Sequence, residues 1–238
     1  MQTSQNQPQR HLHPVIKSLF SKRGLNQNQQ EEFLSWDLKS LPELTDLHDI
    51  TKAAQRIKKS MSYGKKIGVY GDYDVDGTTS CALFWQFFKS LNYENVVLIQ
   101  PSRFVEGYGL HKSSIDDALS QGIDLLITVD CGITNTEAAL YSKEKGLDLI
   151  ITDHHTDACE EMPEAYAIVN PNRRDEPENS PLKTLAGVGV AFCVCLEVKN
   201  LLESEGKTCP SLYPLLEYVA IGTICDLAKL TPVNLKLV

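Results

Sequence analysis

Acidic and imidazole side chains follow short apolar runs in this chain of 238 residues. The runs at 66–70, 125–129 and 148–152 lead into the DYDVDG segment at 72–77, into Asp130, and into the triplet Asp153-His154-His155. A further acidic residue, Asp226, follows the segment AIGTIC. In open parallel sheets the carboxyl ends of the strands face one crevice, so residues placed there converge although they lie far apart in sequence. We therefore expect one shared site.

The alternation of segments from residue 65 onward predicts the fold. Short apolar runs alternate with longer amphipathic stretches, which is typical of successive βα units. The prediction is an α/β fold with a parallel, doubly wound sheet of about five strands flanked by helices. Strands are expected at 67–70, 96–100, 125–129, 149–152 and 167–169, and helices at 78–91, 113–121, 134–145, 188–202 and 212–224.

The part of the chain before residue 65 has a different texture. Residues 1–13 are polar and Gln-rich, so we expect a disordered tail. Residues 14–64 carry apolar spacings that suit short amphipathic helices, and form a helical N-terminal lead-in. Residues 65–238 are then expected to form the α/β catalytic domain.

Composition restricts the class of protein. No apolar stretch approaches the roughly 20 residues of a membrane-spanning helix, and the N-terminus lacks the apolar core of a signal peptide. A cytoplasmic location is therefore expected. The net charge of −8 argues against a surface that coats nucleic acid throughout, because phosphates are held mainly by Lys and Arg. A local basic groove is still compatible with this charge.

The residue types at the expected site suit divalent metal ions. Two cations about 4 Å apart can clamp the oxygens of a phosphodiester and ionise a water. Mn²⁺ and Mg²⁺ prefer carboxylates, and an imidazole among them favours Mn²⁺. If the backbone is extended, alternation places Asp72, Asp74 and Asp76 on one side, where neighbouring carboxylates serve different metals. Gly77 is then expected to let the chain turn into the following helix. The pattern predicts a two-metal phosphoesterase site.

Three other motifs share parts of this pattern. A calcium-binding EF-hand begins D-x-D-x-D-G but needs Glu at its twelfth position, where this chain has Leu83. The haloacid dehalogenase phosphatases have a strand-end DxDGT like residues 74–78, with the first Asp as nucleophile, but that interpretation leaves the DHH triplet unexplained. GVGVAF at 187–192 has two glycines of a dinucleotide fingerprint, yet close packing at a helix start explains it better.

These motifs together resemble those of the DHH phosphoesterases, and within them the branch of single-strand-specific exonucleases. The resemblance covers nearly the whole chain, in the family's order. It is carried by RGLN, EEFL, LHDI, AAQRI, GDYDVDGTTS, PSRFVEGYGL, DLLITVDCGI, ITDHH, AYAIVNPNR, LAGVGVAF and AIGTICDLAKL.

The resemblance implies a role for each matching residue. Asp74 would hold one metal and Asp76 the other, with Asp130 as the bridge between them. His154 and Asp226 would complete the shell of the second metal. The remaining implied roles are Asp72 as an additional ligand or supporting carboxylate, Asp153 as an orienting group, His155 as a contact to the scissile phosphate, and Arg103 as a further phosphate contact.

The resemblance further implies a five-prime to three-prime exonuclease that uses two divalent cations, Mn²⁺ preferred and Mg²⁺ as the alternative, on single-stranded DNA in repair and recombination. Single-strand-binding protein and a RecQ-type helicase are the implied protein partners. Family members continue into a second, DHH-associated domain and an OB-like domain, neither of which is expected before Val238. Two alternatives stay open: a DHH phosphatase for pyrophosphate, cyclic dinucleotides or short oligonucleotides, and a noncatalytic scaffold.

Overall fold

The computed structural model describes residues 12–34, 41–43, 46–101 and 107–238. The chain divides into two compact units, Met1–Asp37 and Leu38–Val238. The first unit contains α1 (Pro14–Lys22) and α2 (Gln27–Phe33). His13 caps α1 by accepting a hydrogen bond from the N–H of Val15, and Phe20 packs edge-on against Phe33 with ring centroids 5.4 Å apart. Residues 1–11 of the expected tail lie outside the described residues.

A five-stranded parallel sheet forms the centre of the second unit. Its strands are β1 (Ile67–Gly71), β2 (Val96–Ile99), β3 (Leu125–Val129), β4 (Asp148–Thr152) and β5 (Ala167–Val169), in the order β2-β1-β3-β4-β5. Every neighbouring pair is parallel. The direction of winding reverses at β1, and ligands bind at such switch points outside the carboxyl ends of the strands. The predicted sheet is confirmed.

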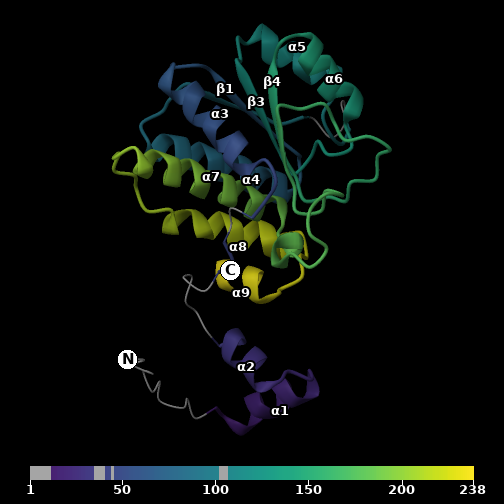
Figure 1. Ribbon diagram of the computed structural model, residues 1–238, viewed down its shortest axis with the longest axis vertical. Helices are drawn as coiled ribbons and strands as arrows, with labels where there is room; N and C mark the ends of the chain where they lie inside the picture. Colours follow the sequence, from purple (N-terminus) through teal and green to yellow (C-terminus); the bar gives the residue numbers. More distant parts are fainter. Residues whose placement is uncertain (1–11, 35–40, 44–45, 102–106) are drawn as a thin grey trace. The chain divides into compact units, whose positions relative to one another are not determined.

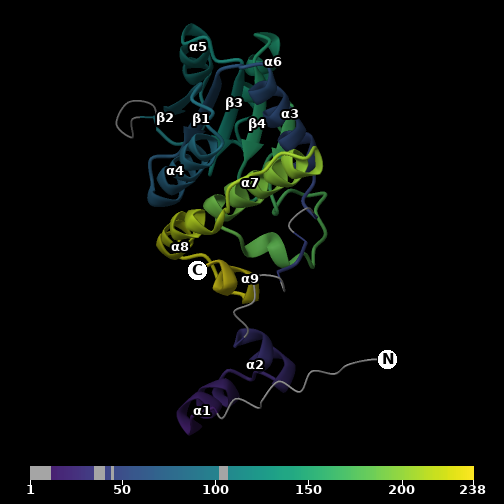
Figure 2. The same ribbon diagram turned by 90° about the vertical axis from the view of Figure 1, so that its left-hand side faces the viewer.

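Helices cover both faces of this sheet (Figures 1 and 2). One face is covered by α3 (Ile50–Ser62), α4 (Val75–Ser90) and α7 (Gly187–Ser204), and the other by α5 (Lys112–Ser120) and α6 (Thr136–Glu144). Successive strand residues face opposite ways. Ile127 accordingly joins the core under α7, and Leu126 joins the core under α5 and α6.

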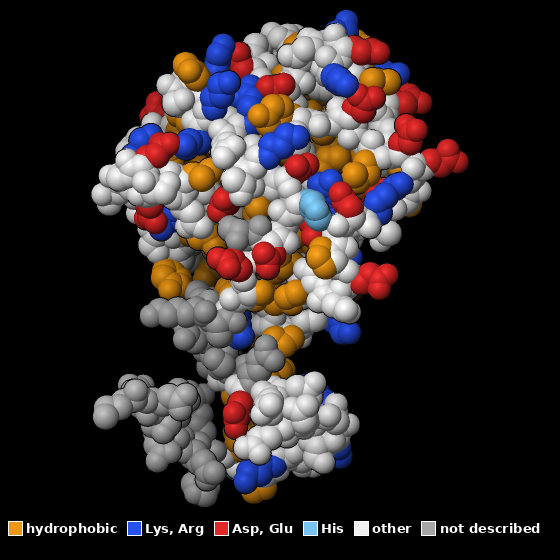
Figure 3. Space-filling model, viewed as in Figure 1, with side chains coloured by type: hydrophobic (Ala, Val, Ile, Leu, Met, Phe, Trp, Pro, Cys, Tyr) orange, Lys and Arg blue, Asp and Glu red, His pale blue; other side chains and the backbone are white. Residues whose placement is uncertain are grey.

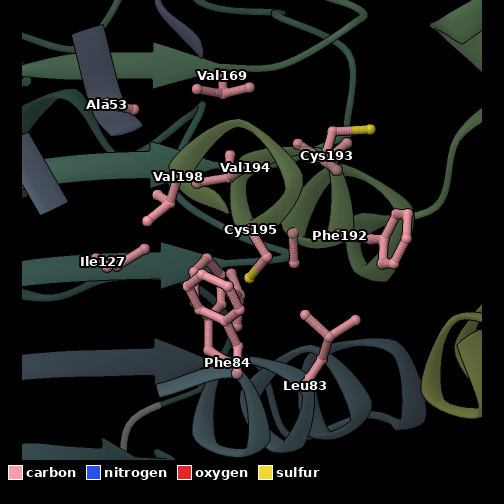
Figure 4. Close-up of a cluster of buried hydrophobic side chains, with 14 of the residues drawn as sticks. Ala53, Leu83, Phe84, Ile127, Val169, Phe192, Cys193, Val194, Cys195 and Val198 are labelled. Atoms are coloured by element: carbon pink, nitrogen blue, oxygen red, sulfur yellow. The ribbon is translucent and has the colours of Figure 1, made fainter. Parts of the chain in front are cut away.

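The larger of the two cores gathers side chains from elements far apart in sequence. Figure 4 shows Ala53 of α3, Phe84 of α4, Ile127 of β3 and Val169 of β5 around the buried side chains of α7. α7 is apolar on nearly all sides because α8 (Leu216–Cys225) covers its outer surface together with that of α4. This outer position of α8 brings its C-terminal end toward the edge of the sheet.

The remaining elements are short. The 3-10 turns η2 (Pro181–Thr184) and η3 (Tyr213–Leu215) precede α7 and α8, and α9 (Pro232–Leu237) packs beside α8 and η2. α3 falls within the lead-in expected at 14–64, and it packs against α7 and β5 of the second unit. Over the residues that are described, we find no helix with the length and apolar character needed to cross a membrane.

The start of α4 corrects one sequence prediction. The helix begins at Val75 rather than at Thr78, because Asp74 is its N-cap and accepts a hydrogen bond of 2.9 Å from the N–H of Gly77. The DYDVDG aspartates therefore do not alternate along an extended strand, and Asp76 lies in the first helical turn. Gly77 is needed for close packing: a Cβ there would lie 2.5 Å from the carbonyl oxygen of Asp72.

Candidate metal centre

Three groups of potential ligands meet at the carboxyl end of the sheet. Asp72, Asp130 and the DHH triplet directly follow β1, β3 and β4, and Asp226 is the C-cap of α8. Within each group the ligand atoms lie within 4.8 Å of one another. Among the described residues the groups are Asp72 with Asp74 and Asp130, Asp76 with His154 and Asp226, and Asp130 with His154 and His155.

Asp130 connects the first two groups. Its Oδ1 lies 3.1 Å from Nε2 of His154, and the same nitrogen lies 3.7 Å from Oδ2 of Asp76. The backbone of Asp130 has φ of 59°, a left-handed conformation that Asp adopts more readily than most residues. Its N–H donates to the carbonyl of Thr152, 3.0 Å away, which fixes the end of β3 against β4. Strained backbone of this kind is often found at functional sites.

Asp76 is held by the N-terminus of α7. Its two carboxylate oxygens accept hydrogen bonds from the N–H groups of Gly187 and Val188, at 2.6 and 2.8 Å. An anion is favoured at a helix N-terminus because unpaired N–H groups and the helix dipole point toward it. Glycine is needed at 187, since a Cβ there would lie 2.8 Å from Oδ1 of Asp130. The GVGV segment thus lets α7 approach both carboxylates.

The electrostatics of the cluster favour a cation. Burial raises the pKa of Asp130 to about 10, with further contributions from Asp76 and Asp74, and burial raises the pKa of Asp76 to about 6. Burial also raises the pKa of Asp72. Three buried ligand atoms, Oδ1 of Asp72, Oδ1 of Asp130 and Nε2 of His154, have no hydrogen-bond partner among the described residues.

Divalent cations fit this donor set. They would neutralise the crowded carboxylates and occupy the unpaired oxygen and nitrogen atoms. Asp226 adds a second argument, because an acidic C-cap faces the negative end of the dipole of α8. A cation at that helix end relieves the repulsion. The first two ligand groups therefore suit two metal ions that share Asp130.

The DHH loop is organised around the carboxylate of Asp153. This buried side chain accepts hydrogen bonds from the backbone N–H groups of His154, His155 and Ile133, at 2.7, 3.0 and 2.9 Å. Nδ1 of His155 lies 2.8 Å from the same carboxylate, so Nδ1 carries the proton. Burial opposes ionisation of Asp153, but these hydrogen bonds hold its pKa below the usual value. The hydrogen bond to Asp153 in turn raises the pKa of His155.

Other contacts to this loop come from residues that are neither acidic nor basic. The hydroxyl of Tyr108 lies 3.2 Å from Nδ1 of His155. Asn170 and Asn172 donate side-chain hydrogen bonds to the carbonyls of His155 and His154, at 2.9 and 2.6 Å. Sequence reasoning missed these three residues as site residues, although Tyr108 lies in the GYG segment and both asparagines lie in the NPNR segment. Arg103 lies outside the described residues.

The face drawn in Figure 3 carries mixed charge. Lys and Arg side chains lie among Asp and Glu side chains over the second unit. A single broad basic area is not seen on this face.

Fold and cluster together define the class of protein. Residues 66–223 match the model of the DHH family, N-terminal domain, and the chain belongs to that family. It is similar to the single-stranded-DNA-specific exonuclease RecJ of Escherichia coli K12, with 36% identity over 229 residues, which are 94% of this chain and 39% of that protein. RecJ of Bacillus subtilis 168 is 37% identical over 227 residues, 95% of this chain and 27% of that protein. The chain thus spans well under half the length of these relatives.

Solved structures agree with this relationship. A structure of exonuclease RecJ bound to manganese superposes with a TM-score of 0.70 and 32% identity, covering 86% of this chain and 48% of that one. RecJ from Thermus thermophilus in complex with Mn²⁺ gives a TM-score of 0.68 and 29% identity, over 92% of this chain and 29% of that one. The complex of the Thermus protein with Mg²⁺ gives a TM-score of 0.56 and 26% identity, covering 92% of this chain and 25% of that one. The α/β fold predicted from the sequence is confirmed.

Proposed function

We propose that this chain binds two divalent cations, Mn²⁺ preferred and Mg²⁺ as the alternative, at the carboxyl end of its sheet. Asp74, supported by Asp72, holds one cation. Asp76, His154 and Asp226 hold the other, and Asp130 bridges the pair. The observation that carries this proposal is the contact of 3.1 Å between Asp130 and His154, which joins two compact ligand groups. The similar RecJ structures with manganese or magnesium support the choice of metals.

The proposed reaction is hydrolysis of phosphodiester bonds in single-stranded DNA from the five-prime end. When bound, two cations polarise the phosphate and lower the pKa of a water. The chain's own residues position the substrate. His155, held by Asp153 and placed beside Tyr108, contacts the scissile phosphate from outside the metal ligands. We assign Arg103 to a further phosphate oxygen, which a planar guanidinium can grip with two hydrogen bonds.

The substrate assignment follows the relatives, which are named single-stranded-DNA-specific exonucleases. Because the chain spans 39% and 27% of those proteins, the activity of the whole relative is a proposal for this chain. The cellular role in DNA repair and recombination is proposed on the same basis. Single-strand-binding protein and a RecQ-type helicase are the proposed protein partners.

The first experiment measures metal and substrate together. Calorimetry with Mn²⁺ is expected to show two bound ions per chain. End-labelled single-stranded DNA, with and without a five-prime phosphate, is expected to lose nucleotides one at a time from the phosphorylated end. His154→Ala should remove the second metal and the cleavage, whereas Asp117→Asn, an exposed acidic residue on α5, should change neither. Unchanged cleavage by His154→Ala contradicts the two-metal assignment.

A substrate panel distinguishes the alternative reactions of the same centre. Pyrophosphate, a cyclic dinucleotide and a short oligonucleotide are compared with long single-stranded DNA at equal metal concentration. Faster turnover of the small substrates would assign the chain to the phosphatase alternative. Two bound metals without turnover of any substrate would leave the metal centre in place but remove the nuclease assignment.

A further inference from the structure

A cavity lies between the segment that precedes α3 and the segment 176–182. Its volume is about 590 Å³, within the range of small-ligand sites, about 300 to 1,000 Å³. Leu47, Leu182 and prolines of both segments form apolar walls, and Glu43, Asp46 and Glu176 add acidic groups. The cavity thus combines an apolar lining with negative charge.

Glu176 is the buried acid of this cavity. Its side chain is 1% exposed, and its Oε1 accepts a hydrogen bond of 2.6 Å from the backbone N–H of His48 and lies 3.2 Å from Nδ1 of the same residue. Its Oε2 is buried and has no hydrogen-bond partner within the described part of the chain. The side chain of Arg173, three residues earlier, forms ion pairs with Asp49 and Asp175 instead of with Glu176. A buried carboxylate is unfavourable unless both oxygens are paired, so this geometry calls for a donor from outside.

We infer that this cavity binds an organic cation, a primary ammonium or guanidinium on an aliphatic stem. The charged end pairs with Oε2 of Glu176 once the side chains over this buried oxygen move aside, and the methylene groups pack against Leu47 and Leu182. Glu43 and Asp46 at the cavity add attraction for a positive ligand. A bare metal ion fits less well, since the groups of metal-ligand type found in the described residues all lie at the site described above.

Two sources supply this chemistry. A free diamine or polyamine presents an ammonium on a methylene chain, and a protein partner presents a Lys or Arg side chain. The segment that carries the cavity also supports the metal centre. Asn172 before it holds the carbonyl of His154, and Gly187 after it donates to Asp76. A ligand in the cavity therefore stabilises a connection whose two ends touch metal-site residues.

Binding is measured on the full chain by NMR, without DNA and without added metal, so the result does not depend on the proposed function. The probes are putrescine, spermidine, and capped tripeptides with a central Lys or Arg, and the readout is the methyl shifts of Leu47 and Leu182. Both leucines line the cavity, so shifts confined to them and their neighbours distinguish binding there from binding of polyamines to other acidic groups of this chain. Saturable shifts with at least one probe are expected. No shift at either leucine with any probe overturns the inference.

Matched substitutions test the charge that the ligand needs. Glu176→Gln keeps the shape and the acceptor for His48, and should weaken binding about tenfold or more, as expected for loss of a charge-assisted pair. Glu178→Gln, exposed on the same segment and outside the cavity lining, should leave affinity unchanged. Equal weakening by both variants, or by neither, contradicts the inference.

A second variant keeps the test valid if Glu176→Gln does not fold. The exposed pair Glu43→Gln with Asp46→Asn leaves the core intact and should weaken binding by about threefold, the change typical of exposed charges. Unchanged affinity in a folded double variant then counts against the cationic ligand. The peptides decide the source: shifts with free amines alone indicate a small molecule, and shifts with the tripeptides indicate a partner's side chain.

Discussion

Asp130 is the residue at which the stability of the fold and the chemistry of the site conflict. It is 1% exposed, has a left-handed backbone, and lies next to the other buried carboxylates. Each of these features is unfavourable in the metal-free chain. The same features place its carboxylate between two groups of potential ligands, which is the position that the proposed bridging role requires. Selection for folding alone would not favour an aspartate here.

A pH series of the metal-free protein tests this conflict. Because the pKa of Asp130 is raised to about 10, its contribution to stability is complete below about pH 4 and is lost as pH rises toward 10. Asp130→Asn removes this loss and keeps a residue that tolerates the left-handed conformation. In EDTA, the difference in Tm between the variant and the parent should grow in favour of the variant by at least about 3 °C from pH 5 to pH 8. Parallel Tm curves would show that Asp130 ionises normally.

Asp153 allows a prediction about positioning. Its carboxylate faces only donors, so Asp153→Asn turns an NH2 group toward N–H groups and leaves them unpaired. We expect a loss of about 1 to 3 kcal/mol in unfolding free energy. DNA cleavage should fall further than Mn²⁺ affinity, because His155 loses its anchor while the metal ligands remain. Glu160→Gln, exposed in the same loop, is the control. An equal loss of metal affinity and cleavage would contradict a positioning role.

Some residues of the site could be predicted from the sequence, and others could not. Carboxylates and histidines at strand ends were predictable because their residue types and the parallel topology both point to one edge. Tyr108, Asn170 and Asn172 were not, because their role depends on the path of loops rather than on their own chemistry. An asparagine that holds a carbonyl looks in sequence like any asparagine in a turn.

At the level of elements, strands were easier to predict than helix starts. The apolar run at 125–129 is a strand with the predicted bounds, because nothing in the run competes with β structure. The predicted start of α4 was wrong because the aspartates that suggested a metal site also serve as helix-capping residues. The helix expected at 212–224 similarly divides into η3 and α8, beginning with a 3-10 turn at Pro214. Local capping and proline geometry decide such boundaries.

The packing of α8 on α4 determines where Asp226 lies, and Gly222 controls that packing. A Cβ at this position would lie 2.5 Å from Oγ1 of Thr79 and 2.8 Å from Oδ1 of Asp76. Gly222→Ala should therefore cost about 1 to 3 kcal/mol despite the better helix propensity of alanine. It should also weaken Mn²⁺ binding, because α8 must move away from Asp76.

Gly189→Ala in α7 is the matched control for this change. Its added Cβ meets the flexible end of Leu185, at 3.0 Å, and no carboxylate. Unfolding by denaturant and calorimetry with Mn²⁺ measure both effects for the two variants. Equal Mn²⁺ affinity in the two variants would show that the position of α8 does not affect the metal centre.

On the scale of the whole molecule, the proposed metal ligands come from elements that are remote in sequence. Asp76 lies in α4, Asp130 follows β3, His154 follows β4, and Asp226 ends α8. The sequence predicted this convergence from the topology of a parallel sheet. It did not predict how α8 reaches the site, because that depends on the packing of one helix over two others. Metal binding is expected to hold these separate parts of the second unit together.

This coupling predicts a metal-dependent thermal stability. A ligand that binds only the folded state at 100 times its Kd stabilises that state by about 2.7 kcal/mol, which corresponds to roughly 5 to 10 °C in Tm for a chain of this size. Mn²⁺ should produce such a shift at neutral pH, and EDTA should reverse it. Protons compete with the metal for the carboxylates whose pKa is raised, so the shift should shrink as pH falls below about 10, the pKa of Asp130, and more steeply below about 6, the pKa of Asp76. His154→Ala should lose most of the shift and Asp117→Asn none; a full shift in His154→Ala would place the stabilising metal elsewhere.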